Sequence, residues 1–290
     1  KDCGENITTG DNNCAFGRAA LKDNQTASEC TAFGHNALSN CTTSNSSAFG
    51  SGALAALTSG QRNTAVGRRA LYLQQTHNEA TAVGYETLYN NTQQLCTAVG
   101  TYAGLNNTTG YITAVGHSAA RNNTTGNGNT VFGQYALYSN QTGINNTAVG
   151  ENALYACTSS VGNNTSVGRY ANMLLTTGGS TTSIGANAGY NSTTGTYNIN
   201  LGGQPPSATS SYNITLGNTG HSTLRCNDTS INSLSDRRDK TDIIDLPIGL
   251  DFLNTLKPRQ FKWQTRDGNI KDGSTRCDFI AQEFQDAEKD

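Results

Sequence analysis

The chain has 290 residues, of which 34% are hydrophobic and 14% are charged, and its formal net charge is −2. So little charge argues against a solvated disordered tail, and near neutrality gives no reason to expect a surface for nucleic acid or an anionic membrane. The length allows two domains, and no apolar run approaches the length of a membrane span.

Residues 1–13 form an N-terminal segment ahead of the first repeat. Because the chain begins with Lys1 rather than methionine, we expect a processed, trimmed or partial protein. Eight cysteines without a paired CxxC pattern predict neither a disulfide scaffold nor a zinc site. The histidines do not recur with carboxylates at metal spacing, and glycine-rich runs lack the ending of a phosphate loop, so we expect no metal and no cofactor.

Residues 14–217 repeat one pattern thirteen times: an apolar residue and a glycine, usually preceded by alanine and in several units followed by an alanine–leucine pair and a polar turn. Successive repeat glycines lie 15 to 18 residues apart, and such self-similarity at a short period indicates stacked structural units. The repeat glycines are Gly17, Gly34, Gly50, Gly67, Gly84, Gly100, Gly116, Gly133, Gly150, Gly168, Gly185, Gly202 and Gly217.

A unit of 16–17 residues is about half the length that two helices with their turns would need. Val, Phe, Thr and Tyr favour strands, and Asn, Gly and Thr clusters favour turns. The sequence therefore predicts an all-β fold, a β-solenoid or β-roll of about thirteen coils, each with two short strands and two bends. At the spacing of sheet strands, thirteen coils give a rod roughly 60 Å long. Each repeat glycine allows a positive φ or a close backbone approach at a corner.

The core of such a rod would be thin, because each coil carries one large apolar residue and one leucine. We expect the face with the recurrent alanine to be buried against neighbouring chains, which predicts an oligomer and in particular a homotrimer. The alternative is a monomeric solenoid that is stable alone.

The A-V-G repeats of residues 14–217 resemble the β-roll heads of trimeric autotransporter adhesins and the repeat shafts of phage and algal-virus fibres. The resemblance implies a left-handed roll, three of which pack around an axis. The unit here is slightly longer than a typical adhesin-head coil, which favours the fibre-type comparison.

After a linker of residues 218–234 the composition changes, and charges become dense in residues 235–290. Apolar residues at helical spacing predict a helix between Pro247 and Pro258. "RQFKW" and "CDFI" predict two strands, and "AQEFQDAEKD" predicts a second helix. The sequence thus predicts a small α+β module.

This module resembles the intramolecular chaperone at the C-terminus of endosialidase-type tail spikes and many phage fibres. The resemblance depends on Ser235, Asp236, Arg238 and Lys240, on "GLDFLNTLKPRQFKW" and on "FIAQE". It implies a module that trimerises, helps the preceding fibre to fold and then cuts itself off. The family domain continues into further helices, so we expect the module to be incomplete here.

The resemblance also implies a serine–lysine dyad, with Ser235 as nucleophile, Lys240 as base and a cut between Leu234 and Ser235. A serine hydroxyl needs a base to take its proton, and lysine can do so only when it is neutral. The adjacent arginines supply positive charge that lowers a lysine pKa. The alternative is a serine that caps a helix or turn beside an exposed lysine.

Sixteen N-x-S/T sequences predict either a heavily N-glycosylated rod or a preferred coil turn that happens to match the pattern. Both hold together if the turns carry the glycans. The candidate asparagines are Asn6, Asn24, Asn40, Asn45, Asn90, Asn106, Asn107, Asn122, Asn123, Asn140, Asn145, Asn163, Asn164, Asn191, Asn213 and Asn227.

Cysteines and tyrosines recur at coil positions. Cys14 and Cys30 occupy nearly the same place in adjacent coils, so a disulfide between them is a candidate. Four tyrosines near the ends of the alanine–leucine segments form either a sugar-binding ladder or, as we favour, packing between coils; they are Tyr72, Tyr89, Tyr138 and Tyr155.

Three function classes remain. We favour a structural subunit of an extracellular or virion-surface fibre or filament, assembled with itself through the C-terminal module. Self-cleavage would be a built-in step of that assembly, with no substrate in trans. The alternative is an adhesin head that binds cell-surface glycans or matrix.

Overall fold

The computed structural model describes residues 3–158, 162–203, 210–218, 220, 258–262 and 275–278. The chain divides into two compact units, Lys1–Leu224 and Arg225–Asp290. Each unit is described by itself.

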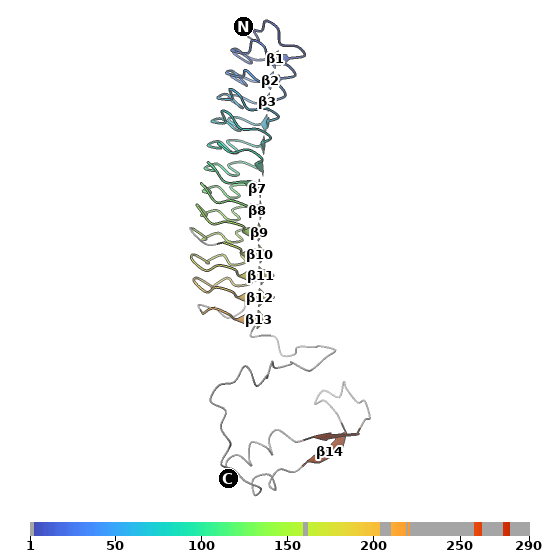
Figure 1. The fold of residues 1–290 in the computed structure, drawn as a ribbon. Helices are drawn as coiled ribbons and strands as arrows, with labels where there is room; N and C mark the ends of the chain where they lie inside the picture. The colour runs from blue at the N-terminus through green and yellow to red at the C-terminus, as the bar shows by residue number, and fades with distance from the viewer. Residues whose placement is uncertain are drawn as a thin grey trace, which may run out of the picture. The chain divides into compact units, whose positions relative to one another are not determined.

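The first unit is a β-solenoid whose thirteen strands form one parallel sheet in sequence order (Figure 1). Each strand pairs with the strand one coil further along the chain, so the sheet runs the length of the solenoid. The strands are β1 (Cys14–Phe16), β2 (Thr31–Phe33), β3 (Ser47–Phe49), β4 (Thr64–Val66), β5 (Thr81–Val83), β6 (Thr97–Val99), β7 (Ile112–Val115), β8 (Asn129–Phe132), β9 (Thr147–Val149), β10 (Thr165–Val167), β11 (Thr182–Ile184), β12 (Ile199–Leu201) and β13 (Ile214–Leu216). The predicted β-solenoid is confirmed, and its thirteen strands match the thirteen repeats, while the left-handed winding stays a prediction.

Each described coil contains one strand, so the expectation of two strands per coil was wrong. The remainder of the coil is a series of turns in which residues of positive φ alternate with ordinary ones, as at Arg69 (φ 55°) and Leu71 (φ 50°). Alternation of this kind prevents an extended run, although it costs conformational energy for bulky residues. Backbone bonds between coils offset the cost, for example from the Leu71 N–H to the Thr87 carbonyl at 3.0 Å.

The register of the sheet places like residues in columns, with Ala65 opposite Ala82 and Val66 opposite Val83. Successive strand residues face opposite sides of a sheet. The middle residue of the strand is the buried one, since Ala65 and Ala82 are 0% exposed while Val66 is 38% exposed. The recurrent alanine therefore lies inside its own coil, and the expectation that it contacts neighbouring chains was wrong.

Leucines and alanines form the apolar part of the interior. The fully buried leucines stack from coil to coil, and each one stabilises the fold by about 1.5–3 kcal/mol relative to an exposed side chain. They include Leu21, Leu38, Leu54, Leu71, Leu88, Leu137 and Leu154.

A buried amide ladder forms the polar part of the interior. Each side-chain amide donates to the amide oxygen one coil back: Asn91 to Gln74 at 2.8 Å, Asn107 to Asn91 at 2.8 Å, Asn123 to Asn107 at 2.8 Å and Asn140 to Asn123 at 2.7 Å. The same amides also bond carbonyls of their own turns, as Asn123 bonds Gly126 at 2.9 Å. Buried amides are tolerated when they are paired in this way.

The repeat glycines have both expected features, a positive φ and a close approach to the backbone of the next coil. Gly116 has a φ of 132°, and a Cβ atom placed there would lie 2.6 Å from the carbonyl carbon and oxygen of Gly133 in the next coil. The coils are therefore stacked backbone on backbone at this corner.

In the second unit the structure describes an antiparallel pair, β14 (Arg259–Lys262) and β15 (Thr275–Asp278), with Arg259 opposite Asp278. The strand predicted at "RQFKW" is confirmed, and the one predicted at "CDFI" begins two residues earlier than expected. Both predicted helices lie outside the described residues.

We predict that Gly116→Ala lowers the free energy of unfolding by about 3 kcal/mol or more, because alanine combines an unfavourable φ with a clash against the next coil. Gly179→Ala is the matched control, since the nearest atom to its added Cβ is a carbonyl oxygen at 3.3 Å and its φ is not positive. The control should change stability by less than about 1 kcal/mol. Urea denaturation followed by circular dichroism measures both, and equal effects would contradict the corner assignment.

Candidate functional site

An apolar stripe runs along the outer face of the sheet from β1 to β13. It consists of the last residue of each strand, directly before the repeat glycine, and every member is apolar. Exposure reaches 70% at Phe16, 45% at Ile184 and 53% at Leu216. The apolar stripe comprises Phe16, Phe33, Phe49, Val66, Val83, Val99, Val115, Phe132, Val149, Val167, Ile184, Leu201 and Leu216.

The stripe is ordered along its length by contacts between coils. The rings of Phe16, Phe33 and Phe49 stack with centroids 5.6 Å apart at each step. Near the C-terminal end, Ile199 and Ile214 at the first strand position add further exposed apolar surface on the same face. A continuous apolar surface of this length is uncommon on a monomeric protein and indicates an interaction site.

In some coils, charged and phenolic side chains lie just after the repeat glycine, beside the stripe. They form ion pairs and hydrogen bonds with the equivalent residues of neighbouring coils. Arg69 lies 3.3 Å from Glu86, and Arg68 donates to the Tyr85 hydroxyl at 2.8 Å. The hydrogen bond and negative charge of Glu86 raise the pKa of Tyr85, so this phenol stays neutral. Exposed pairs of this kind contribute little to stability, roughly 0–1 kcal/mol each.

Tyrosines stack between coils. The rings of Tyr72 and Tyr89 are parallel with centroids 5.1 Å apart, and those of Tyr138 and Tyr155 are parallel at 5.2 Å. The favoured interpretation, packing between coils, is therefore confirmed. The faces that stack on each other are not available to a sugar ring.

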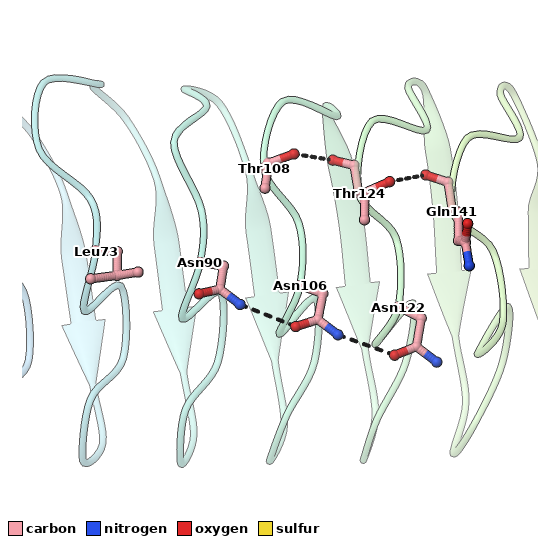
Figure 2. Close-up of a pocket in the computed structure, with 7 residues that line it drawn as sticks. All are labelled: Leu73, Asn90, Asn106, Thr108, Asn122, Thr124 and Gln141. Carbon is pink, nitrogen blue, oxygen red and sulfur yellow. Dashed lines mark hydrogen bonds between the residues drawn. The ribbon is translucent and has the colours of Figure 1, made fainter.

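A shallow depression lies on the turns that follow β4 to β8, lined by Leu73, Asn90, Asn106, Thr108, Asn122, Thr124 and Gln141 (Figure 2). Its amides bond one another, Asn90 to Asn106 and Asn106 to Asn122 at 3.1 Å each. Its threonine hydroxyls bond backbone carbonyls of the next coil at 2.8 and 2.9 Å. The lining carries no ionisable side chain, so the depression offers hydrogen bonding but no acid, base or nucleophile.

Residues 235–290, the segment that contains β14 and β15, match the family described as chaperone of endosialidase. We call this the endosialidase-chaperone segment. The match leaves residues 1–234 outside it. No curated protein and no solved structure matches the chain.

The predicted dyad of the endosialidase-chaperone segment, Ser235 and Lys240, lies outside the described residues and stays a prediction. Within the described ranges there is no cluster of three metal-ligating side chains. In those same ranges no helix has the length and apolar character needed to cross a membrane.

The sequon asparagines fall into three groups by exposure. Five are fully buried core residues, so their assignment as glycosylation candidates was wrong: Asn24, Asn107, Asn123, Asn140 and Asn164. Their amides face the interior and bond other core groups, so a glycan there is incompatible with the coil. Six are exposed, namely Asn6, Asn40, Asn45, Asn145, Asn163 and Asn191; Asn90, Asn106, Asn122 and Asn213 are half-buried, and Asn227 lies outside the described residues.

The structure does not place the candidate pair Cys14 and Cys30 for a disulfide. Cys14 pairs in register with Thr31, so Cys30 is one position out of step with it. A one-residue offset places two side chains on opposite faces of a strand, and accordingly Cys14 is exposed while Cys30 is buried. Cys3 is also exposed, and Cys41, Cys96 and Cys157 are buried and free.

Proposed function

We propose that the chain is a structural subunit of an extracellular or virion-surface fibre, in which three solenoids pack side by side along the apolar stripe. The endosialidase-chaperone segment starts and aligns this assembly. The apolar stripe is the observation that carries the proposal, and the family match of residues 235–290 supports the assembly role.

The stripe suits a parallel assembly of identical chains because the same kind of residue recurs in the same place on every coil. A rotation axis parallel to the stack brings equivalent coils to the same level, and a closed ring of such contacts gives a finite oligomer. Burying one partly exposed stripe residue gains about 1 kcal/mol. Association costs roughly 4–15 kcal/mol, so only a stripe of many coils can hold the chains together.

Repetition also creates the need for an alignment device. If one chain slides by a single coil, nearly all stripe contacts reform with an equivalent partner, so the free-energy difference between registers is small. A separate segment at one end that joins the chains fixes both their number and their register. We assign this task to the endosialidase-chaperone segment.

We predict that the double variant Val99→Glu, Val115→Glu loses the oligomer, because it places charges in the middle of the stripe that the proposed assembly buries. The coil itself should remain folded, since both side chains point away from its interior. Sedimentation equilibrium measures the mass and circular dichroism the fold.

Gln75→Glu is the matched control, because Gln75 is exposed on a turn away from the sheet. It should leave the oligomer mass unchanged. An unchanged mass in the double variant would overturn the stripe as the interface.

We further propose that Ser235 and Lys240 release the segment by cutting the Leu234–Ser235 bond. The prediction is that mass spectrometry of the assembled chain detects a product ending at Leu234, and that Ser235→Ala abolishes it by removing the nucleophile. Ser233→Ala is the matched control and should leave the product unchanged. Cleavage that persists in Ser235→Ala, or an intact mass in the unaltered assembled chain, would contradict the dyad.

The six exposed sequon asparagines are compatible with glycans on the turns of such a fibre. We propose that glycosylation, where it occurs, is confined to these and the half-buried positions. This fits an extracellular or virion-surface location.

A further inference from the structure

Two buried thiols meet in the interior of the second coil. Cys30 directly precedes β2, and Cys41 lies eleven residues further on, in the turns that follow the strand. Both side chains are 0% exposed. Both sulfurs contact one acceptor, the carbonyl oxygen of Thr43, at 3.3 Å from Cys30 and 3.0 Å from Cys41.

The repeat shows independently that these two coil positions face each other. Cys96 directly precedes β6 as Cys30 precedes β2, and Asn107 lies eleven residues after it. The Asn107 side-chain nitrogen contacts the Cys96 sulfur at 3.6 Å. Cys30 and Cys41 therefore occupy the coil positions of Cys96 and Asn107, with a thiol at both positions.

The other two buried cysteines lack a thiol opposite. The residue that faces Cys96 is Asn107, and the residue eleven positions before Cys157 is Asn146. Among the coils that the structure describes, the second coil alone combines two cysteines in this way. Cys96 and Cys157 are therefore internal controls: both are buried, and neither faces a second thiol.

The nearness of the two thiols favours thiol–disulfide chemistry at Cys30. Because the Cys41 thiol can donate to a Cys30 thiolate, it lowers the pKa of Cys30 to about 7, and the same interaction raises the pKa of Cys41. Burial raises the pKa of Cys157 to about 12 and also raises the pKa of Cys96. Since the thiolate is the attacking species, Cys30 is the most readily activated of the four.

We propose that Cys30 and Cys41 form a disulfide across the interior of the second coil when the chain folds in an oxidising compartment. The oxidant is a small-molecule or protein disulfide. The Cys30 thiolate attacks one sulfur of that disulfide and releases its partner as a thiolate. The Cys41 sulfur then loses its proton and attacks the Cys30 sulfur, which releases the second carrier thiolate. The two cysteines lose two protons and two electrons in total, and the carrier is reduced to two thiols.

Such a crosslink would stabilise the solenoid close to its N-terminal end. Coils near an end have fewer neighbours, so they open more easily than central coils. A disulfide that closes a short loop restricts the unfolded chain and so favours the closed coil.

The test uses the full chain refolded in a mixture of reduced and oxidised glutathione. Free thiols are blocked with N-ethylmaleimide after denaturation, and the chain is digested. Trypsin leaves both cysteines on the peptide of residues 23–62, and chymotryptic cleavage after Phe33 separates them. We expect two peptides joined by a bond that dithiothreitol breaks, with Cys96 and Cys157 alkylated. Alkylation of both Cys30 and Cys41, or their linkage to other cysteines, overturns the proposal.

A melting experiment supplies a second readout. Dithiothreitol should lower the melting temperature of the oxidised chain by about 5 °C or more. Cys96→Ser should keep this dependence, and the double variant Cys30→Ser, Cys41→Ser should lose it. If the double variant does not fold, the peptide map of the unaltered chain decides alone.

Discussion

The two-residue alternation of a short strand within a narrow coil determines the rest of the structure. Each strand turns its middle residue inward and its first and last residues outward. That position holds alanine in most coils, because leucines and paired amides already fill the space opposite, and the other buried residues found there are Val131, Ser166, Ser183 and Asn200. A larger residue therefore faces outward in every coil, next to a glycine whose lack of a side chain lets successive coils touch.

The repetition of similar coils stabilises the solenoid, and it also leaves an exposed stripe and an ambiguous register between chains. Backbone bonds, leucine stacks and amide ladders all run along the axis, so each coil is held by its two neighbours. The same repetition leaves a continuous apolar stripe exposed on the described part of the solenoid, and it makes one register between chains nearly equal in free energy to the next. In a fibre built this way, partner chains cover the apolar stripe along its length, and a separate segment sets the register between the chains.

The sequence predicted the β-solenoid with its thirteen repeats and the role of the glycines, because both follow directly from the repeat period. The sequence analysis assigned the two faces of the A-V-G strand wrongly. Large apolar residues are usually buried, but here the narrow interior holds the alanine and the valine faces outward. Asn123 was interpreted as a surface turn residue, although it belongs to the buried ladder, because composition cannot distinguish a paired amide from a solvated one. The contact between Cys30 and Cys41 required the coil geometry, which a count of cysteines does not contain.

Electron cryomicroscopy of the purified full chain tests the central claim most directly. The account predicts particles in which three solenoids run side by side, with β1 to β13 of each turned toward a common axis and the stripe residues in contact. Single solenoids whose Val and Phe column faces solvent, or bundles joined through another face, would contradict it.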